Sequence, residues 1–273
     1  MINFVHVLGI AVLLLYLGAC LALWIERRSG RGYRSELLLV VGVALHTVCN
    51  GLLLIEGVLT QLDRGSHYLM LISWVLALAC LWWRRRRDDG VLGQALLVAV
   101  IVLLVAASVL AHGEVAEPRA MQSLLFVGFH VLPAVLAESC LILACLVSLI
   151  ALRQEMRIKR KQVDPILLAG PNLRALDRFS AGVAVLGLVG ISVALLTGIA
   201  WSLAAAQPVL SADLRKLSAF VLWLVLSLIV MLRWRGDLSA YRLSRITVMS
   251  SCVFLLTLLI SFLVQGQVWH GFE

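Results

Sequence analysis

Histidine is the residue type with the clearest chemistry in this sequence, and two of the six histidines lie inside long apolar runs. His46 stands in VALHTVCNGLLL, and His130 stands in VGFHVLPAVLA. Imidazole is the most common side-chain ligand for metal ions, and it also binds haem iron. A polar ring at membrane depth is a functional candidate, and its structural alternative is a hydrogen bond between helices. The sequence therefore marks His46 and His130 as candidate ligands, with that alternative open.

Two further polar side chains accompany these histidines. Asn50 follows His46 by four residues, so the two share one face of a helix, where Asn50 could orient the imidazole or bridge helices. Glu138 is the only formally charged residue between 122 and 152. It lies eight residues from His130 and partly off its face, so we expect no direct couple between them. We expect Glu138 to be protonated or bonded to a neighbouring helix.

The other histidines occupy less informative positions. His6, His67 and His112 lie at the ends of apolar runs, and His270 lies in the C-terminal tail. Rings with a polar tip suit a membrane interface, so we expect His6, His67 and His112 to be structural or solvated.

No other catalytic motif is apparent. The sequence has no Gly-rich phosphate loop, no H-E-x-x-H and no G-x-S-x-G. All six cysteines fall within apolar runs and none forms a C-x-x-C pair, so we expect apolar fillers rather than a thiol–disulfide relay.

Composition excludes a soluble domain. The chain is 62% hydrophobic with a mean hydropathy of +1.01, values typical of a multi-pass membrane protein. Its net charge of +8 could suggest nucleic-acid binding. The basic residues, however, stand in short runs between apolar segments, as membrane topology requires, so we expect no nucleic-acid partner. The partner that the composition implies is the lipid bilayer.

The apolar runs predict an all-α, polytopic membrane bundle of about eight transmembrane helices. Runs of this length exceed what barrel strands need. The first run has no basic segment before it and no convincing cleavage site, so we expect a retained helix. The expected spans are 4–24, 37–59, 67–83, 91–112, 122–152, 179–203, 217–232 and 246–266.

Basic residues predict the orientation of the chain. The connections after the first, third, fifth and seventh spans hold 19 of the 23 Lys and Arg residues. Positive charge concentrates on the cytoplasmic side, so both termini are predicted to lie outside the cytoplasm. The longest connection, 153–178, is expected partly to follow the cytoplasmic interface.

The span 122–152 is expected to form the inner wall of a site open toward the outer face. No internal repeat is evident on inspection. We therefore predict a single membrane domain, with a variable group of four helices in 1–121 and a second group of four in 122–273.

The second group of helices resembles the membrane cytochrome c assembly family, which includes CcsA-type, HemX-like and YpjD-like proteins. The order and spacing of several segments carry the resemblance, and the length and eight spans are most similar to the short HemX-like branch. These segments are FHVLPAVLAESCLILACLVSLIAL with RQEMRIKRK, LRALDRF, LLTGIAWS, LSAFVLW, RWRG and LVQGQVWH.

The resemblance implies haem handling. By position, His130 is similar to the family histidine at the outer part of the equivalent helix, and His270 is similar to the one after the last family glycine, here Gly266. His46 resembles an intramembrane family histidine. The expected cofactor is haem b, bound by a pair among His46, His130 and His270. The expected location is a bacterial inner membrane, with other proteins of cytochrome c or haem biogenesis as partners.

One departure limits the expected activity. Family members that attach haem carry a Trp-rich loop between the sixth and seventh spans, and residues 203–217 contain no Trp. We therefore expect haem binding or haem-linked regulation rather than an enzyme that ligates haem to apocytochrome. Trp201, at the end of the sixth span, is either an interface anchor or a wall for a flat cofactor.

Two other functions stay open at this stage. One is a regulatory membrane partner that acts through the basic cytoplasmic connections. The other is a proton-coupled transporter of small solutes that uses Glu138 and the histidines.

Overall fold

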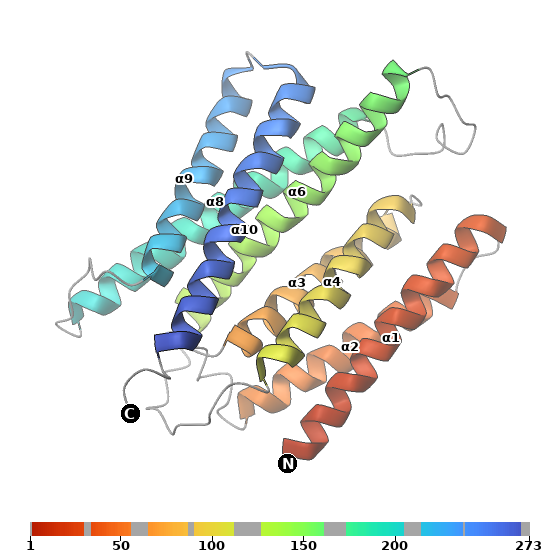
Figure 1. Cartoon of the computed structure of the whole chain (residues 1–273), viewed down its shortest axis with the longest axis vertical. Coiled ribbons are helices and arrows are strands. Elements are labelled where there is room, and N and C mark those ends of the chain that lie inside the picture. Colours follow the sequence, from red (N-terminus) through yellow and green to blue (C-terminus); the bar gives the residue numbers. More distant parts are fainter. Residues whose placement is uncertain are drawn as a thin grey trace. The chain divides into compact units, whose positions relative to one another are not determined.

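The computed structural model describes residues 2–29, 34–55, 65–86, 90–111, 127–160, 173–204, 214–236 and 238–268. These residues form eight long α-helices and one π-helical turn (Figure 1). The α-helices are α1 (Ile2–Ser29), α2 (Arg34–Ile55), α3 (Gly65–Arg86), α4 (Gly90–Ala111), α6 (Leu132–Lys159), α8 (Leu173–Ala204), α9 (Leu214–Arg235) and α10 (Ala240–Val268). The π-turn, η2 (Val127–Val131), leads directly into α6. The predicted all-α architecture is confirmed.

Length and composition confirm a multi-pass membrane protein. Within the described residues, seven helices, α1 to α4, α6, α8 and α9, are long and apolar enough to cross a membrane. The eighth predicted span, 246–266, lies within α10, which is a continuous helix of 29 residues. Outward-facing side chains such as Leu14, Val109 and Leu196 are more than 60% exposed, as expected for surfaces that contact lipid rather than water.

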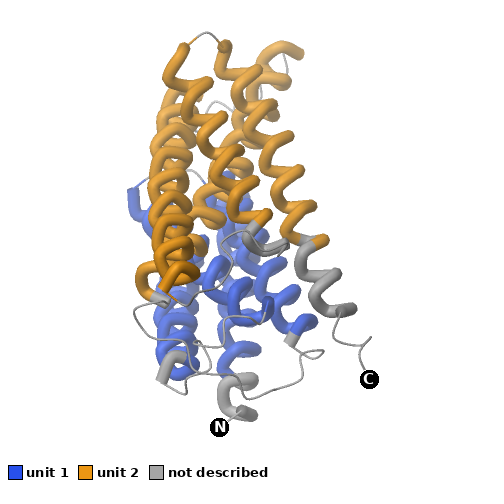
Figure 2. The backbone as a smooth tube through the Cα atoms, turned by 90° about the vertical axis from the view of Figure 1, so that its left-hand side faces the viewer, with its two compact units in different colours: residues 1–124 blue, residues 125–273 orange. Residues whose placement is uncertain are grey.

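The chain divides into two compact units, residues 1–124 and 125–273 (Figure 2). In the first unit, α1 packs against α2, α2 against α3, α3 against α4, and α4 back against α1. In the second unit, α6, α8, α9 and α10 close a ring in the same order. Each unit is thus a four-helix bundle with neighbours consecutive in sequence.

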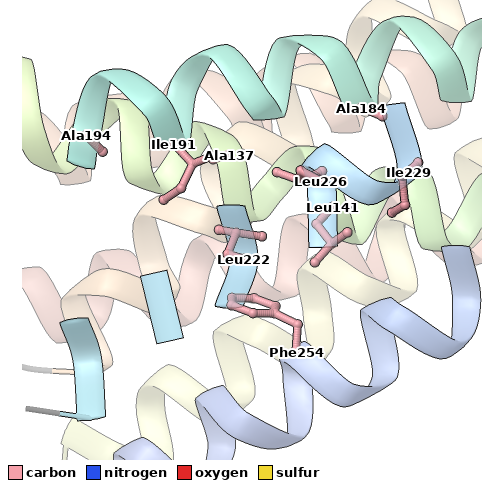
Figure 3. Packing of buried hydrophobic residues seen from close by; sticks show 9 residues of the cluster. All are labelled: Ala137, Leu141, Ala184, Ile191, Ala194, Leu222, Leu226, Ile229 and Phe254. Atoms are coloured by element: carbon pink, nitrogen blue, oxygen red, sulfur yellow. The ribbon is translucent and has the colours of Figure 1, made fainter. Parts of the chain in front are cut away.

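Small residues set the packing of the second unit. A Cβ atom on Gly187 would lie 2.9 Å from Cβ of Cys140, and one on Gly190 would lie 2.9 Å from the Pro133 carbonyl oxygen. These glycines let α6 and α8 approach closely. Figure 3 shows the apolar core beside this seam, formed by Ala137, Leu141, Ala184, Ile191, Ala194, Leu222, Leu226, Ile229 and Phe254.

Two boundary predictions were wrong. The span 122–152 was expected as one helix, but its described part begins with a π-turn and continues to Lys159. Residues 173–178 were assigned to the connection 153–178, but they form the first part of α8. Leu176 in that segment is completely buried, so packing extends the helix beyond the apolar run.

Candidate functional site

Pro133 shapes the start of α6. Because proline has no N–H, it cannot donate the usual helical bond to the carbonyl of Phe129, four residues earlier. The local backbone is π-helical from Val127 to Val131. The hydroxyl of Thr197 on α8 lies 3.0 Å from the Phe129 carbonyl oxygen and 2.8 Å from the Val193 carbonyl oxygen of its own helix, so its one proton is shared between these acceptors. Isolated π-turns within helices are frequent at functional sites. The π-turn contains His130.

The imidazole of His130 is held by α8. Nδ1 lies 2.8 Å from the backbone carbonyl oxygen of Ala194. A carbonyl oxygen only accepts, so Nδ1 carries the proton and Nε2 carries the ring's lone pair. The ring lies over Gly198, where a Cβ atom would come within 2.7 Å of Cε1. Backbone on α8 therefore fixes both the tautomer and the place of a half-buried imidazole.

His46 lies in a different environment. Its side chain is completely buried on α2, and its Nδ1 lies 3.2 Å from the hydroxyl of Tyr16 on α1. The Met70 carbonyl on α3 approaches the imidazole, but no described residue forms a well-directed hydrogen bond with Nε2. The Tyr16 hydroxyl can donate or accept, so the tautomer of His46 depends on what Nε2 meets.

Asn50 adds two further polar atoms one turn along α2. The residue is 7% exposed, and neither its amide oxygen nor its amide nitrogen has a hydrogen-bond partner among the described residues. A buried polar group without a partner costs about 1–3 kcal/mol. Water or a ligand atom would offset that cost, so His46 and Asn50 mark a polar position inside the first unit.

The predicted residues are not all brought together. His46 and Asn50 belong to the first unit and His130 to the second, while His270 lies outside the described residues. Glu138 is buried in α6, and Trp201 is about half exposed on α8. No cluster of three or more His, Cys, Asp or Glu side chains suited to a bare metal ion occurs within the described ranges.

The environments of His130 and His46 differ in how well they fit a haem ligand. At His130, the proton on Nδ1 leaves Nε2 as the coordinating atom, and a backbone carbonyl as second partner is the usual support of a ligating histidine. His130 therefore fits an axial ligand. His46 is fully enclosed, so a porphyrin would reach its Nε2 only if the surrounding helices separated.

Two arginines form contacts between helices that the sequence did not predict. On α3, Arg84 donates to the Ser35 hydroxyl at 3.2 Å and lies 3.7 Å from the Glu26 carboxylate. On α9, Arg233 donates to Asp177 at 2.7 Å and to the Ser180 hydroxyl at 2.9 Å. Both guanidinium groups turn inward, and each links helices of its own unit at the end that is predicted to be cytoplasmic.

Tyr16 was also missed. A tyrosine within the apolar run 4–24 is a visible signal, because a buried hydroxyl usually finds a partner. The identity of that partner, 30 residues away on another helix, is visible only in the structure.

Comparison with known proteins agrees with this architecture. No curated protein matches the chain. A family model described as cytochrome C assembly protein matches residues 64–270. The matched region contains α3, α4 and all the helices of the second unit, including His130, whereas His46 precedes it. Because the match covers well over half of the sequence, this chain belongs to the cytochrome c assembly protein family.

Proposed function

We propose that this protein binds haem b in support of cytochrome c biogenesis or haem homeostasis, with His130 as an axial ligand. Family membership supports the role in cytochrome c biogenesis. The observation that supports haem ligation is the 2.8 Å bond from His130 Nδ1 to the Ala194 carbonyl, because it leaves the lone pair of the ring on Nε2. When bound, haem supplies a redox-active iron and the macrocycle that cytochrome c requires.

An apolar surface beside the π-turn supports the same proposal. A groove of about 320 Å³ lies between α6 and α8, with Gly128 and Pro133 on one wall and Gly190 and Val193 on the other. Cofactor sites are lined mainly by apolar groups with a few polar groups that fix orientation. His130 does not line this groove, but the groove lies along the same helices and would supply an apolar surface near the imidazole.

We propose His270 as the second axial ligand. His270 is the last residue of the matched family segment, whereas His46 precedes that segment. His46 would require α1, α2 and α3 to separate around its imidazole. We place the protein in a bacterial inner membrane, close to the HemX-like branch, acting with other biogenesis proteins as a haem carrier or regulator rather than an enzyme.

The test is optical spectroscopy of protein purified in mild detergent and loaded with haemin. His130→Gln keeps a side-chain N–H donor for the Ala194 carbonyl but offers a poor iron ligand. His67→Gln is the matched control, since this histidine also lies near the start of a helix. We expect a Soret band in the wild type and the His67→Gln control that is lost or shifted in His130→Gln.

Two results would contradict the proposal. A folded wild-type protein that stays colourless on titration does not bind haem. A His130→Gln variant with an unchanged spectrum and affinity would show that His130 only links α6 to α8. Either result must come from protein that elutes as a single species on size exclusion.

One observation favours the transporter alternative. Glu138 is the one acidic side chain that is buried among the described residues. Proton flux in proteoliposomes that requires Glu138 and is abolished by Glu138→Gln would support transport. Unchanged flux would remove that alternative.

A further inference from the structure

Two helix ends of the second unit, residues 153–160 of α6 and 240–245 of α10, carry an excess of positive charge. The two helices pack against each other, and α6 ends where α10 begins (Figure 1). The basic residues on these helix ends are Arg153, Arg157, Lys159, Arg160, Arg242 and Arg245. Glu155 is the one acidic side chain that the structure describes there. This surface is therefore strongly cationic, and it suits a partner with negative charge.

The ring of Tyr241 on α10 gathers two of these cations. Nζ of Lys159 lies 4.3 Å from the centroid of the ring, and the guanidinium carbon of Arg245 lies 5.9 Å from it. The face of an aromatic ring attracts cations and so holds both side chains in place. Lys159 also lies 3.0 Å from the Glu155 carboxylate, but one carboxylate does not balance two cations. The Lys159 side chain stays 62% exposed, so its ammonium group can bond to a further acceptor.

An apolar stripe continues from Arg245 along the outward face of α10. The side chains of Met249, Val253 and Leu256 are each more than half exposed. Steps of three or four residues keep them on the face of the helix that Arg245 occupies. In a membrane-spanning bundle, such a stripe contacts lipid rather than water. The two cations thus stand at one end of a surface that is apolar along the rest of its length.

We propose that Lys159 and Arg245 form a binding site for an anionic phospholipid, with the phosphate between the two cations and an acyl chain along the α10 stripe. The stripe favours a lipid over inorganic phosphate, which has no apolar part, and over an acidic protein, which does not follow a helix into the bilayer. This end of the unit is predicted to be cytoplasmic, where cations next to the membrane meet anionic headgroups. The site lies at the opposite end of α6 from His130, so it goes beyond haem binding and does not depend on it.

The test is titration of the full-length protein in mild detergent with phosphatidylglycerol or phosphatidylcholine of the same acyl chains. The rise of the melting temperature with lipid concentration gives the affinity. The wild type should bind phosphatidylglycerol more tightly than phosphatidylcholine. The double variant Lys159→Gln and Arg245→Gln should bind phosphatidylglycerol roughly 25-fold more weakly, because each cation near an anionic headgroup contributes a factor of about five.

The matched control is the double variant Arg178→Gln and Arg235→Gln. It removes the same charge from exposed side chains on α8 and α9 of the same unit, and it should keep the wild-type affinity. An equal loss of affinity in the two double variants would overturn the site, because it would show a general attraction between charges. Inorganic phosphate at the lipid concentration should not displace the lipid, and full displacement would overturn the role of the acyl chain.

The wild type alone also tests the proposal, which keeps it open to refutation if a variant does not fold. Raising the salt concentration from 0.1 M to 1 M shortens the screening length from about 10 Å to about 3 Å. The preference for phosphatidylglycerol should therefore fall toward that for phosphatidylcholine. Equal affinity for the two lipids at low salt, or a preference that salt leaves unchanged, would overturn the proposal.

Discussion

Replacing Gly198 by alanine tests whether α8 positions His130. The added Cβ would lie 2.7 Å from Cε1 and 3.1 Å from Nδ1 of the imidazole. Carbon atoms pack at about 3.5–4.0 Å, so the ring must move by roughly 1 Å. A displacement of that size breaks a hydrogen bond that now measures 2.8 Å to the Ala194 carbonyl.

The expected loss of stability follows from these terms. Overpacking costs about 1–3 kcal/mol and the lost hydrogen bond about 1 kcal/mol, while alanine in place of glycine stabilises a helix by about 0.5–1 kcal/mol. We expect Gly198→Ala to lower the free energy of unfolding by about 1–3 kcal/mol. Gly182→Ala on the same helix is the matched control, because nothing lies within 4 Å of its Cβ position.

The assay is unfolding in detergent followed by circular dichroism, together with the ¹⁵N chemical shifts of the His130 ring. Gly182→Ala should equal or slightly exceed the wild type in stability. The reasoning is refuted if Gly198→Ala is as stable as Gly182→Ala and the His130 ring nitrogens keep their wild-type shifts.

Three further predictions concern the bonds that hold the helices and the orientation of the chain. Thr197→Val removes a hydroxyl shared between the Phe129 carbonyl and the Val193 carbonyl of α8, so it should lower the free energy of unfolding by about 1 kcal/mol or less. Thr257→Val, whose hydroxyl donates to the Val253 carbonyl within α10, should cost less, and equal losses in chemical unfolding would contradict this. Arg233→Gln should lower the free energy of unfolding by about 2 kcal/mol or more, because the guanidinium is 10% exposed and bonded to α8. Arg235→Gln is the control and should change thermal stability little. Similar melting temperatures for the two variants would show that the bonds of Arg233 to α8 contribute little. An alkaline phosphatase reporter fused after Ala111 should be active and one fused after Arg235 inactive, and the reverse pattern would invert the predicted topology.

The helices and their class were predictable because apolar runs long enough to cross a bilayer have few alternatives. The positions of His46 and His130 within apolar runs were also visible in the sequence. The predicted helix boundaries were wrong where packing extends a helix beyond its apolar run, as at Leu176, and where the chain forms a π-turn before Pro133.

The partners of the site residues were not predictable, because they come from distant helices. The sequence shows a proline three residues after His130, but the carbonyl of Ala194 that accepts from this histidine is 64 residues away. Basic residues were interpreted only as markers of topology, so the inward bonds of Arg84 and Arg233 were not predicted.

The central claim is that His130 ligates haem iron, and the most direct measurement is pulsed EPR of haem-loaded protein labelled with ¹⁵N-histidine. The account predicts hyperfine coupling from a directly coordinated imidazole nitrogen, which His130→Gln removes or changes while the His67→Gln control keeps it. Haem-loaded protein with no coupling from histidine nitrogen, or with coupling that His130→Gln leaves unchanged, would contradict it.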